Sequence, residues 1–332
     1  MPLSFRNIAR SYLLIIVLLL TFGSLLVSGQ TPLLTGQINR YAKVTAVGTS
    51  HVIVDNAGQF AAGDTVMVMQ MNGVVINAGT DLGGNYQAAT GAPGKYEIII
   101  VSSVNTGTRR IDFSRVLMNT YDPAASVQLV KVRTYRDAVV NTQLSCQAWD
   151  SASVTGGVLV FMVKGVLTLN SNINVAGTGF RGGIVSQGLG WCQNAHDTLR
   201  YESYNIWSVV AGYKGEGLAI RTAMGQPLYP SFMKGKGANM TGGGGGNGHF
   251  SGGGGGSNYG SGSVGDQEMP SVTCGFLWTG GRPGFTVASY STLNTGVYMG
   301  GGGGASVYLT TPTTSAGGNG GGIVIIHADT IV

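Results

Sequence analysis

The sequence predicts an all-β protein: a small antiparallel β barrel or sandwich, followed by a β-solenoid-like or sandwich domain with a polyglycine-helix bundle. Three observations support this fold class. Charged residues make up 10% of the chain, against about 25% in ordinary globular proteins. Glycine accounts for 57 of 332 residues while 43% of the chain is hydrophobic, which excludes a disordered, charge-rich chain. After residue 30, helix signals are nearly absent and short β-rich runs dominate.

Residues 1–29 have the three-part layout of a secretory signal peptide. Arg6 and Arg10 form a positive first region, Tyr12–Leu20 is an unbroken apolar run, and small residues end it at Gly29. The alternative is a transmembrane anchor, but a span needs about 20 apolar residues, and polar residues and glycine interrupt the run. We therefore expect export, cleavage near Gly29, and no membrane span after cleavage. The expected location is secreted or on the cell surface, at the exterior of the outer membrane.

Residues 30–150 are predicted to form an N-terminal β domain. Five runs in this part are rich in β-branched or alternating apolar residues, and Gly, Asn, Asp or Pro turns bound them, as is typical of short strands. Strands of this length and spacing favour a small antiparallel barrel or sandwich. The runs are Lys43–Val47, His51–Asp55, Thr65–Met71, Tyr96–Val104 and Ser126–Val132.

Residues 151–332 are predicted to form a glycine-rich β domain. The segment "GGVLVFMVKGVLTLNSNINVAG" contains short strands at Val158–Val163, Val166–Leu169 and Ile173–Val175, with a minimal turn at Lys164-Gly165. Short strands broken by Gly and Asn corners are typical of a stacked β-solenoid, although no strict period can be counted. The segment "GGNGGGIVIIHADTIV" is a strong strand that runs to Val332. We therefore expect the native chain to continue beyond Val332.

Charge and cysteine content argue against several functions. The net charge is +5, and the longest run of basic residues is Arg109-Arg110, so no nucleic-acid partner is predicted. Cys146, Cys192 and Cys274 are too few for a disulfide framework. One bridge is compatible with an oxidising compartment, and the spacing does not select a pair.

No cofactor or metal site is predicted. Gly177–Gly182 fits the pattern G-x-G-x-x-G after an apolar strand, but a dinucleotide fingerprint needs a helix to follow it. The next residues, "GIVSQGLGW", contain glycines that would break a helix. No calcium-binding loop is present among the carboxylates. The histidines are far apart and fit no metal-binding spacing; they are His51, His196, His249 and His327.

No catalytic residue is predicted, and we expect a protein that is not an enzyme. Glycoside hydrolysis needs two carboxylates at a suitable spatial separation, and the sequence selects no pair among its 14 Asp and Glu residues. The tryptophans could stack on sugar rings, but we favour a core-filling role in a domain that is poor in side-chain volume. They are Trp149, Trp191, Trp207 and Trp278.

Three runs of five glycines are the most unusual feature of the chain. Ordering glycine costs more backbone entropy than ordering any other residue, so such runs fold only when packing compensates. Extended left-handed helices with three residues per turn can pack closely without side chains, whereas a flexible linker is longer and lacks aromatic residues. We predict neighbouring segments of one rigid bundle, made from Gly242–Gly246, Gly252–Gly256 and Gly300–Gly304.

The turns of this bundle supply the candidate recognition residues. The spacer and the flank of the second run read "NGHF" and "SNY", and their side chains would project from the ends of glycine segments. We therefore predict His249, Phe250 and Tyr259 as surface-recognition residues.

Several segments resemble the amino-terminal region of large glycine-rich secreted surface proteins of Bacteroidota. They are "WDSASVTGGVLVFMVKGVLTLNSNINVAGTGFRGG", "GYKGEG", "GGGGGNGHFSGGGGGSNYG", "GGGGGAS" and "GGNGGGIVIIHADTIV", with "FAAGDTVMVMQMNG" and "YDPAASVQLVKV" upstream. The resemblance covers nearly all of the mature chain. Many such proteins end in a type IX secretion sorting domain or a gliding-motility-associated domain. The glycine runs are also similar to those of anaplastic lymphoma kinase-type receptors and phage tail-tip adhesins.

The resemblance implies a non-enzymatic cell-surface structural or adhesin-like module. Its glycine-rich bundle would be a rigid scaffold or a recognition platform, and its partners would be surface glycans or other cell-surface proteins, besides the export machinery. The alternative is a carbohydrate-active β-solenoid enzyme or a carbohydrate-binding module. An enzyme of that kind would present two carboxyl groups about 5–10 Å apart in an aromatic-lined cleft.

Overall fold

The computed structural model describes residues 31–76, 85–184, 186–187, 211–219, 234–247, 251–267, 280–308 and 316–332. Helical structure among these residues is limited to the 3-10 turns Pro123–Ala125 and Val287–Ser289. The predicted all-β class is therefore confirmed. The leader predicted over residues 1–29 lies outside the described residues, and within the described part no helix has the length and apolarity needed to cross a bilayer.

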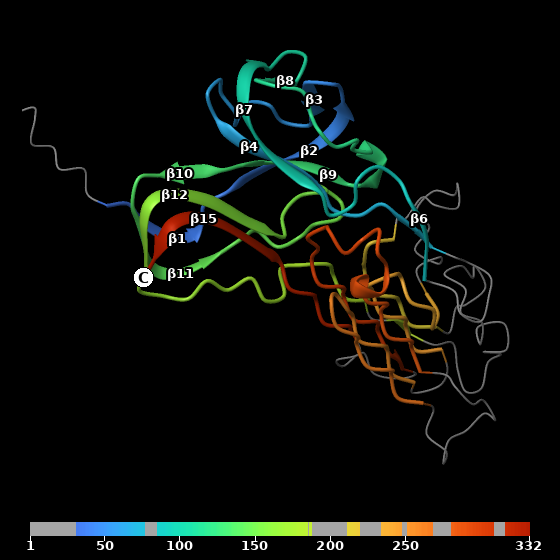
Figure 1. Ribbon diagram of the computed structural model, residues 1–332. Helices are drawn as coiled ribbons and strands as arrows, with labels where there is room; N and C mark the ends of the chain where they lie inside the picture. Colours follow the sequence, from blue (N-terminus) through green and yellow to red (C-terminus); the bar gives the residue numbers. More distant parts are fainter. Residues whose placement is uncertain are drawn as a thin grey trace, which may run out of the picture.

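Six antiparallel strands close into a small barrel (Figure 1). Around it the strand order is β2-β3-β8-β7-β4-β9, and each neighbouring pair is antiparallel. Of the two predicted forms, barrel or sandwich, the chain adopts the barrel. Its strands are β2 (Arg40–Val47), β3 (His51–Val54), β4 (Thr65–Gln70), β7 (Tyr96–Asn105), β8 (Arg110–Phe113) and β9 (Val127–Lys131).

Alternating side chains give the barrel an apolar interior and a mixed exterior, because successive residues of a strand point to opposite faces. In β2, Ala42 and Val44 are buried in the barrel core, while Tyr41 and Lys43 lie on the outer side and are partly exposed. Leu129 of β9 is fully buried in the same core. The alternation therefore directs Lys43 away from the barrel axis, toward the rest of the molecule.

The other long strands form a curled parallel sheet beside the barrel. Its order is β1-β11-β12-β10, and β15 pairs along β12 from Val158 to Leu167. Parallel neighbours need long crossover connections, which matches the predicted solenoid-like part better than a hairpin sandwich. The strands are β1 (Leu33–Gln37), β10 (Arg133–Tyr135), β11 (Ala138–Ser145), β12 (Val158–Leu169) and β15 (Ile323–Ile331).

Strand pairing in this sheet crosses residue 150. β10 and β11 fall within residues 30–150 and pair with β12, and β1 joins the sheet through β11. The turn expected at Lys164-Gly165 is replaced by a continuous β12, whose register with β15 shifts between Val163 and Val166. The Asp137 carboxylate accepts a hydrogen bond from the Val166 N–H at 2.9 Å, which supports the bend without ending the strand.

The two faces of the parallel sheet contribute to different cores. Leu159 and Phe161 pack in a cluster inside the curled sheet, while Val158 and Val160 pack against residues of the barrel and of the glycine-rich part. The expected strand Ile173–Val175 is reduced to an isolated bridge at Ile173 and borders the inner cluster. The sheet therefore lies between its own core and a second core that it shares with its neighbours.

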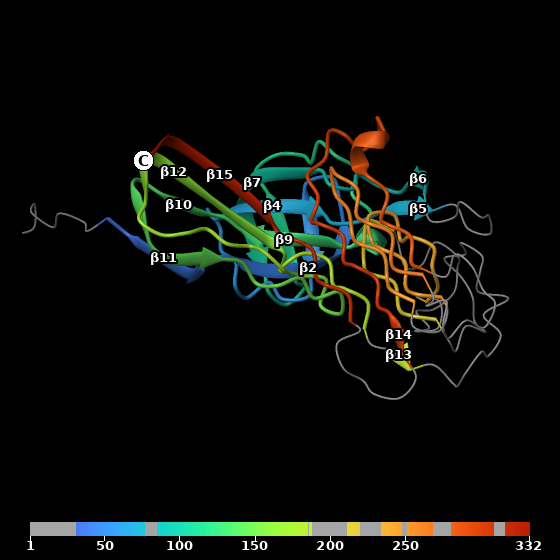
Figure 2. The same cartoon turned by 90° about the horizontal axis from the view of Figure 1, so that it is seen from below.

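The three glycine runs lie next to one another, as predicted. The Gly254 N–H donates to the Gly244 carbonyl and the Gly304 N–H donates to the Gly254 carbonyl, each at 2.8 Å. The Gly243 N–H donates to the Gly302 carbonyl at 2.9 Å. Figures 1 and 2 show these orange and red segments side by side in both views. We call this arrangement the glycine stack; it comprises residues 179–183, 211–219, 234–247, 251–257, 280–284, 300–305 and 316–322.

The runs are neither α-helix nor β-strand. The predicted helical geometry of a polyglycine bundle is not shown and stays a prediction. None of the glycines in the three runs is among those with a positive φ. The runs therefore depend on the missing side chain of glycine and not on its access to left-handed backbone conformations.

Close approach of the backbones explains why these positions are glycine. A Cβ atom on Gly244 would overlap the Lys236 carbonyl, and one on Gly304 would overlap the Gly244 carbonyl. The same holds at Gly302, where the obstacle is the Arg181 carbonyl. The segments are thus separated by less than any side chain requires, and backbone hydrogen bonds take the place of a side-chain core.

A hairpin joins the barrel to the glycine stack. β5 (Val74–Ile76) pairs antiparallel with β6 (Tyr86–Ala89). The N–H groups of Gly73 and Val74 both donate to the Leu218 carbonyl, at 3.1 and 2.9 Å. The end of β4 and the start of β5 are therefore fixed against the stack, and the junction between barrel and stack is a defined surface.

We predict that Gly244→Ala destabilises the chain by about 1–3 kcal/mol, because the new methyl group must displace backbone. Gly318→Ala is the matched control: a Cβ there meets open space and its φ is not left-handed. The control should be neutral or stabilise by about 0.5 kcal/mol, since alanine lowers the entropy of the unfolded chain. Urea unfolding of both variants checks this, and equal effects would contradict the packing explanation.

The Glu97 side chain holds the loop after β8 in place through hydrogen bonds. Its side chain accepts hydrogen bonds from the N–H groups of Met118 and Asn119, both at 2.9 Å, and from the Arg115 guanidinium at 3.0 Å. Burial by itself would raise the pKa of the Glu97 carboxyl, but the hydrogen bonds from Asn119, Met118 and Arg115 outweigh it and hold this pKa below its usual value. The carboxylate form is therefore favoured in the folded chain.

We predict that Glu97 makes the barrel sensitive to acid. A carboxyl with a depressed folded-state pKa contributes stability that is complete above its unfolded value, 4.5, and is lost as the pH falls below it. Glu97→Gln should be less stable than the parent chain at neutral pH and should lose less stability on acidification. Urea midpoints at about pH 7 and about pH 3 measure the difference. A variant that loses as much as the parent chain would exclude Glu97 as the source.

Candidate functional site

The predicted recognition residues do not converge on a described site. His249 and Phe250 lie outside the described residues. Tyr259 follows the second glycine run and is 74% exposed, as expected for a residue displayed at a turn. The recognition role of all three therefore remains a prediction.

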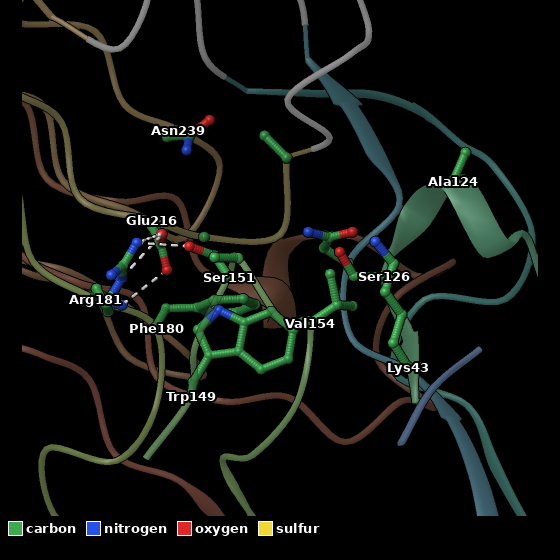
Figure 3. Close-up of a pocket in the computed structure, with 14 residues that line it drawn as sticks. Lys43, Ala124, Ser126, Trp149, Ser151, Val154, Phe180, Arg181, Glu216 and Asn239 are labelled. Carbon is green, nitrogen blue, oxygen red and sulfur yellow. Dashed lines mark hydrogen bonds and ion pairs between the residues drawn. The ribbon is translucent and has the colours of Figure 1, made fainter. Parts of the chain in front are cut away.

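A pocket of about 390 Å³ lies where the barrel, the start of the solenoid-like part and the glycine stack meet (Figure 3). Its volume falls within the range of about 300–1,000 Å³ that is usual for small-molecule sites. Its lining combines aromatic, cationic, amide and hydroxyl side chains from segments far apart in the sequence. The lining residues are Lys43, Asn72, Ala124, Ser126, Trp149, Ser151, Ala152, Val154, Phe180, Arg181, Glu216, Gly217, Ala219 and Asn239.

Trp149 and Phe180 border the pocket and are packed in the apolar core beneath it. Their ring centroids are 5.9 Å apart and the rings meet edge to face at 81°, a favourable aromatic geometry. Trp149 is 3% exposed and Phe180 is 1% exposed. The core-filling role favoured for the tryptophans is thus confirmed for Trp149. Trp191, Trp207 and Trp278 lie outside the described residues.

A tight turn forms the lip of the pocket. The Asp150 carboxylate accepts hydrogen bonds from the N–H groups of Ala152 and Ser153, at 3.0 and 3.3 Å. The bond from the Ala152 backbone is the main reason that the pKa of Asp150 lies below its usual value. The turn holds Ser151 and Ala152 at the pocket edge, so this side of the site is formed before any ligand arrives.

Arg181 and Glu216 form an ion pair on one wall. An Arg181 Nη2 to Glu216 Oε1 distance of 3.3 Å joins the charges, and the Arg181 N–H donates to Glu216 Oε2 at 3.2 Å. The Glu216 N–H donates back to the Arg181 carbonyl at 2.8 Å, and Arg181 also donates to Ser151 Oγ at 2.6 Å. Glu216 is 8% exposed. Its carboxylate is therefore held in place by a cation and by backbone.

Lys43 lies on the opposite side of Trp149 from this ion pair in Figure 3. It comes from the outer side of β2 and is partly exposed. Among the described residues, no ion pair or hydrogen bond is recorded for its ammonium group, whereas its backbone N–H is bonded to Asp55. The pocket thus contains one cation without a fixed partner.

Asn72 adds an unsatisfied acceptor to the lining. Its Oδ1 atom is buried and has no hydrogen-bond partner. The backbone at this position is fixed, because the Gln70 side chain donates to the Asn72 carbonyl at 2.8 Å and to the Thr90 carbonyl at 2.8 Å. Buried acceptors without partners are rare and costly, at about 1–3 kcal/mol. Because the Oδ1 atom is buried, a ligand in the pocket does not reach it.

The pocket lining contains a single carboxylate, Glu216, and that group is paired. Glycoside hydrolysis requires two carboxyl groups, one of them free to transfer a proton; the described lining does not bring two together. Among the described residues, no three His, Cys, Asp or Glu side chains lie together as a metal ion would require. His51 lies in β3 and His327 in β15, while His196 and His249 lie outside the described residues.

Cys146 is a buried free thiol next to the Trp149 segment. Its sulfur donates to Thr178 Oγ1 at 3.2 Å, and burial raises the pKa of the thiol above its usual value. A buried thiol with a raised pKa is unreactive. Cys192 and Cys274 lie outside the described residues, so any pairing between them stays open.

The sequence-based interpretation missed the polar residues of the pocket. Arg181 is the single charge inside "GFRGG", and Glu216 lies between two glycines in "GYKGEG". A charged side chain with glycine neighbours has little packing of its own and needs contacts elsewhere, which is the signal that could have identified both. Lys43 and Asn72 gave no comparable signal, because their role depends on where the barrel meets the stack.

Comparisons with known proteins reveal little similarity to this chain. No protein-family model matches it, and no curated protein does. Among solved structures, it is similar to the tailspike protein gp49 from Pseudomonas phage LKA1, with 15% sequence identity and a TM-score of 0.20. The match covers 41% of this chain and 22% of the tailspike chain, so the chain spans about a fifth of that protein's length. A likeness at this level carries no functional argument.

We predict that Arg181→Gln lowers the free energy of unfolding by about 1–2 kcal/mol, because Glu216 loses its cation in a buried place. The value is moderate because the Arg181 side chain is 49% exposed and water screens the pair. Combining Arg181→Gln with Glu216→Gln should cost less than the sum of the single changes, with a coupling of about 0.5 kcal/mol or more. Urea unfolding of the parent chain, the two single variants and the double variant measures this coupling energy. Additive losses would mean that the ion pair contributes nothing to stability.

Proposed function

We propose that this chain is a non-enzymatic cell-surface module with a structural or adhesin-like role. In this proposal the glycine stack is the scaffold, and the pocket at its junction with the barrel is the recognition site. The observation that carries the proposal is the pocket itself, whose described lining has a cation without a fixed partner, Lys43, beside hydroxyl and amide side chains. Such a lining is suited to holding a polar ligand.

The construction of the scaffold supports a binding role. Backbone hydrogen bonds link the glycine segments, and the pocket lip and the ion pair are held by bonds within the protein. A site that is formed before binding loses little conformational entropy when a ligand arrives, so weak polar contacts are sufficient for useful affinity. Adhesive modules benefit from this, because many weak sites on one surface act together.

The low charge content and the predicted leader support a location outside the cell. Together with the resemblance to secreted surface proteins of Bacteroidota, they favour secretion or attachment at the exterior of the outer membrane. The partners in this proposal are surface glycans or other cell-surface proteins, and the export machinery handles the chain before it arrives. Type IX secretion and gliding motility are the settings that the resemblance suggests.

The alternative is a carbohydrate-active β-solenoid enzyme or a carbohydrate-binding module. The curled parallel sheet and the pocket over Trp149 favour it. The enzyme form is the weaker of the two, because Glu216 is the single carboxylate of the described lining and its charge is paired with Arg181. The binding-module form overlaps with the adhesin proposal and differs from it only in biological setting.

A polysaccharide retention experiment tests the proposal. We expect the purified chain to be retained on at least one immobilised surface polysaccharide from a mixed panel, and to release no new reducing ends during long incubation. Release of reducing ends that grows with protein concentration would favour the enzyme. Absence of retention on every polysaccharide would contradict glycan recognition and leave cell-surface proteins as the partners of the module. Bovine serum albumin on the same matrix gives the background.

A further inference from the structure

We propose that the glycine stack binds a glycine-rich segment of another protein chain along one open side of residues 300–305, which we call the central segment. The two walls of this binding position are residues 252–257 and 316–322. None of the three segments contributes to the pocket lining, so the inference goes beyond the proposed recognition site. It is carried by a three-residue repeat in the hydrogen bonds, by backbone groups without partners at the same repeat, and by space beside Gly303.

The hydrogen bonds of the central segment repeat every three residues. Its N–H groups donate to three neighbouring segments in turn, and residues three apart donate to the same segment. A repeat of three is that of an extended left-handed backbone, in which residues three apart face the same direction. The direction of a backbone group therefore follows from its place in the repeat. The donor pairs are Gly300 and Gly303 to residues 316–322, Gly301 and Gly304 to residues 252–257, and Gly302 and Ala305 to residues 211–219.

One pair of carbonyl groups in the central segment has no partner. The bonded pairs are Gly300 and Gly303, which accept from residues 179–183, and Gly302 and Ala305, which accept from residues 234–247. For the carbonyls of Gly301 and Gly304, no hydrogen bond is recorded in the described part of the chain. Because these two residues are three apart, their carbonyls face the same side.

The wall formed by residues 252–257 has two N–H groups without partners. The bonded N–H groups of this wall are those of Gly252 and Gly255, which donate to residues 263–266, and those of Gly254 and Ser257, which donate to residues 241–244. Between them, the N–H groups of Gly253 and Gly256 have no partner among the described residues. Both glycines are partly exposed. They are again three residues apart, so both N–H groups face one direction.

The opposite wall has the same pattern. The N–H groups of Gly317 and Gly320 donate to the carbonyls of Gly183 and Phe180, each at 2.8 Å. Those of Gly318 and Gly321 have no partner within the residues that the structure describes. Gly318 and Gly321 are both exposed.

The groups without partners lie along one side of the central segment. A Cβ atom on Gly253 would meet the Gly304 carbonyl, and one on Gly256 would meet the Gly301 carbonyl. The partnerless residues of this wall are therefore next to the partnerless carbonyls. On the other wall, the Gly318 nitrogen is the atom nearest to a Cβ built on Gly303.

The central segment faces outward at Gly303, between the two walls. A Cβ atom on Gly303 would lie 3.5 Å from the Gly318 nitrogen and 3.6 Å from the Gly254 carbonyl oxygen. These are ordinary contact distances to one atom of each wall, whereas a Cβ on Gly302 or Gly304 would overlap backbone. Gly303 is also partly exposed. Another backbone can therefore approach the central segment at this place.

The chemistry of the open side selects a glycine-rich backbone. The walls offer N–H groups and the base offers carbonyls, so the occupant must supply acceptors and donors at a repeat of three. A proline-rich segment has this repeat but lacks N–H groups, and a β-strand has a repeat of two. Contacts as close as those within the stack leave no room for side chains that face the walls.

Residues 317–322 show which sequence fits the edge of the stack. They read "GGNGGG". A Cβ on Gly317 or Gly320 would overlap a carbonyl of the central segment. Asn319, in contrast, is exposed, and its side chain accepts a hydrogen bond from the Gly182 N–H at 2.9 Å. Glycine is thus required where a segment faces the stack, and one polar residue per turn is tolerated. Repeats of Gly-Gly-Asn are therefore the matching probe.

Fluorescence anisotropy with a labelled Gly-Gly-Asn repeat tests the inference on the purified chain. A peptide of about nine residues makes about three turns and should bind saturably. Ala-Ala-Asn and Pro-Pro-Asn repeats of the same length should bind at least about tenfold more weakly, because the first adds methyl groups and the second lacks most N–H groups. No binding of the Gly-Gly-Asn peptide, or equal binding of either control peptide, would overturn the proposal.

Gly303→Ala separates binding from folding. The new methyl group fits between the walls but takes the space that the peptide needs, so the melting temperature should be kept while peptide affinity falls about tenfold or more. Gly260→Ala is the matched control, because a Cβ there meets open space, its φ is not left-handed, and it lies outside the three segments. A Gly303→Ala variant that binds the peptide as well as this control would exclude the site.

Amide hydrogen exchange on the parent chain locates the peptide without any substitution. Bound peptide should slow exchange at the four partnerless N–H groups of the walls, since a hydrogen bond protects an amide. They are Gly253, Gly256, Gly318 and Gly321. Unchanged exchange at all four would overturn the proposal.

Self-association is the outcome that would change the partner. If the purified chain forms oligomers that the Gly-Gly-Asn peptide dissociates, the open side belongs to a second copy of this chain, and a separate partner is excluded. Sedimentation velocity over a range of chain concentrations measures this. The peptide experiments can fail while polysaccharide retention succeeds, and the reverse, because the pocket and the open side share no residue.

Discussion

Backbone-to-backbone contact between glycine segments is the constraint on which the rest of this structure depends. The segments approach so closely that a methyl group on Gly244, Gly302 or Gly304 would overlap a neighbouring carbonyl. Hydrogen bonds between N–H and carbonyl groups then replace side-chain packing. A region built in this way has no apolar core of its own. Its attachment to the molecule must come from the few large side chains at its ends.

One shared core provides that attachment. The largest apolar cluster includes Met67 and Val130 of the barrel, Val158 of the parallel sheet, and Met240 and Met299 beside the glycine runs. Flexible methionine side chains are suited to filling irregular gaps between elements of different geometry. The barrel, the sheet and the glycine stack therefore stabilise one another through a common interface, and the stack is held in place by neighbours that have conventional cores.

The pocket lies at the edge of this arrangement. Its described lining combines residues of the barrel side with residues of the glycine stack. Arg181 and Glu216, isolated among glycines, pair with each other across its wall, while Lys43 and Asn72 enter from the barrel side. The described lining thus brings charged residues of the barrel and of the stack to one junction, where the proposed recognition site lies.

The sequence by itself determined the all-β class, the barrel strands except β8, and the proximity of the glycine runs. Alternating apolar residues, turn residues and side-chain-free runs are local signals, and each limits its own segment to few conformations. Only the tertiary structure decided that β1, β10 and β11 join β12 and β15 in a parallel sheet, because the choice of pairing partner is made between distant segments. The pocket depends on the same kind of contact. The residues next to Lys43 and Asn72 in the sequence give no indication of it, since the pocket exists only where the folded barrel meets the folded stack.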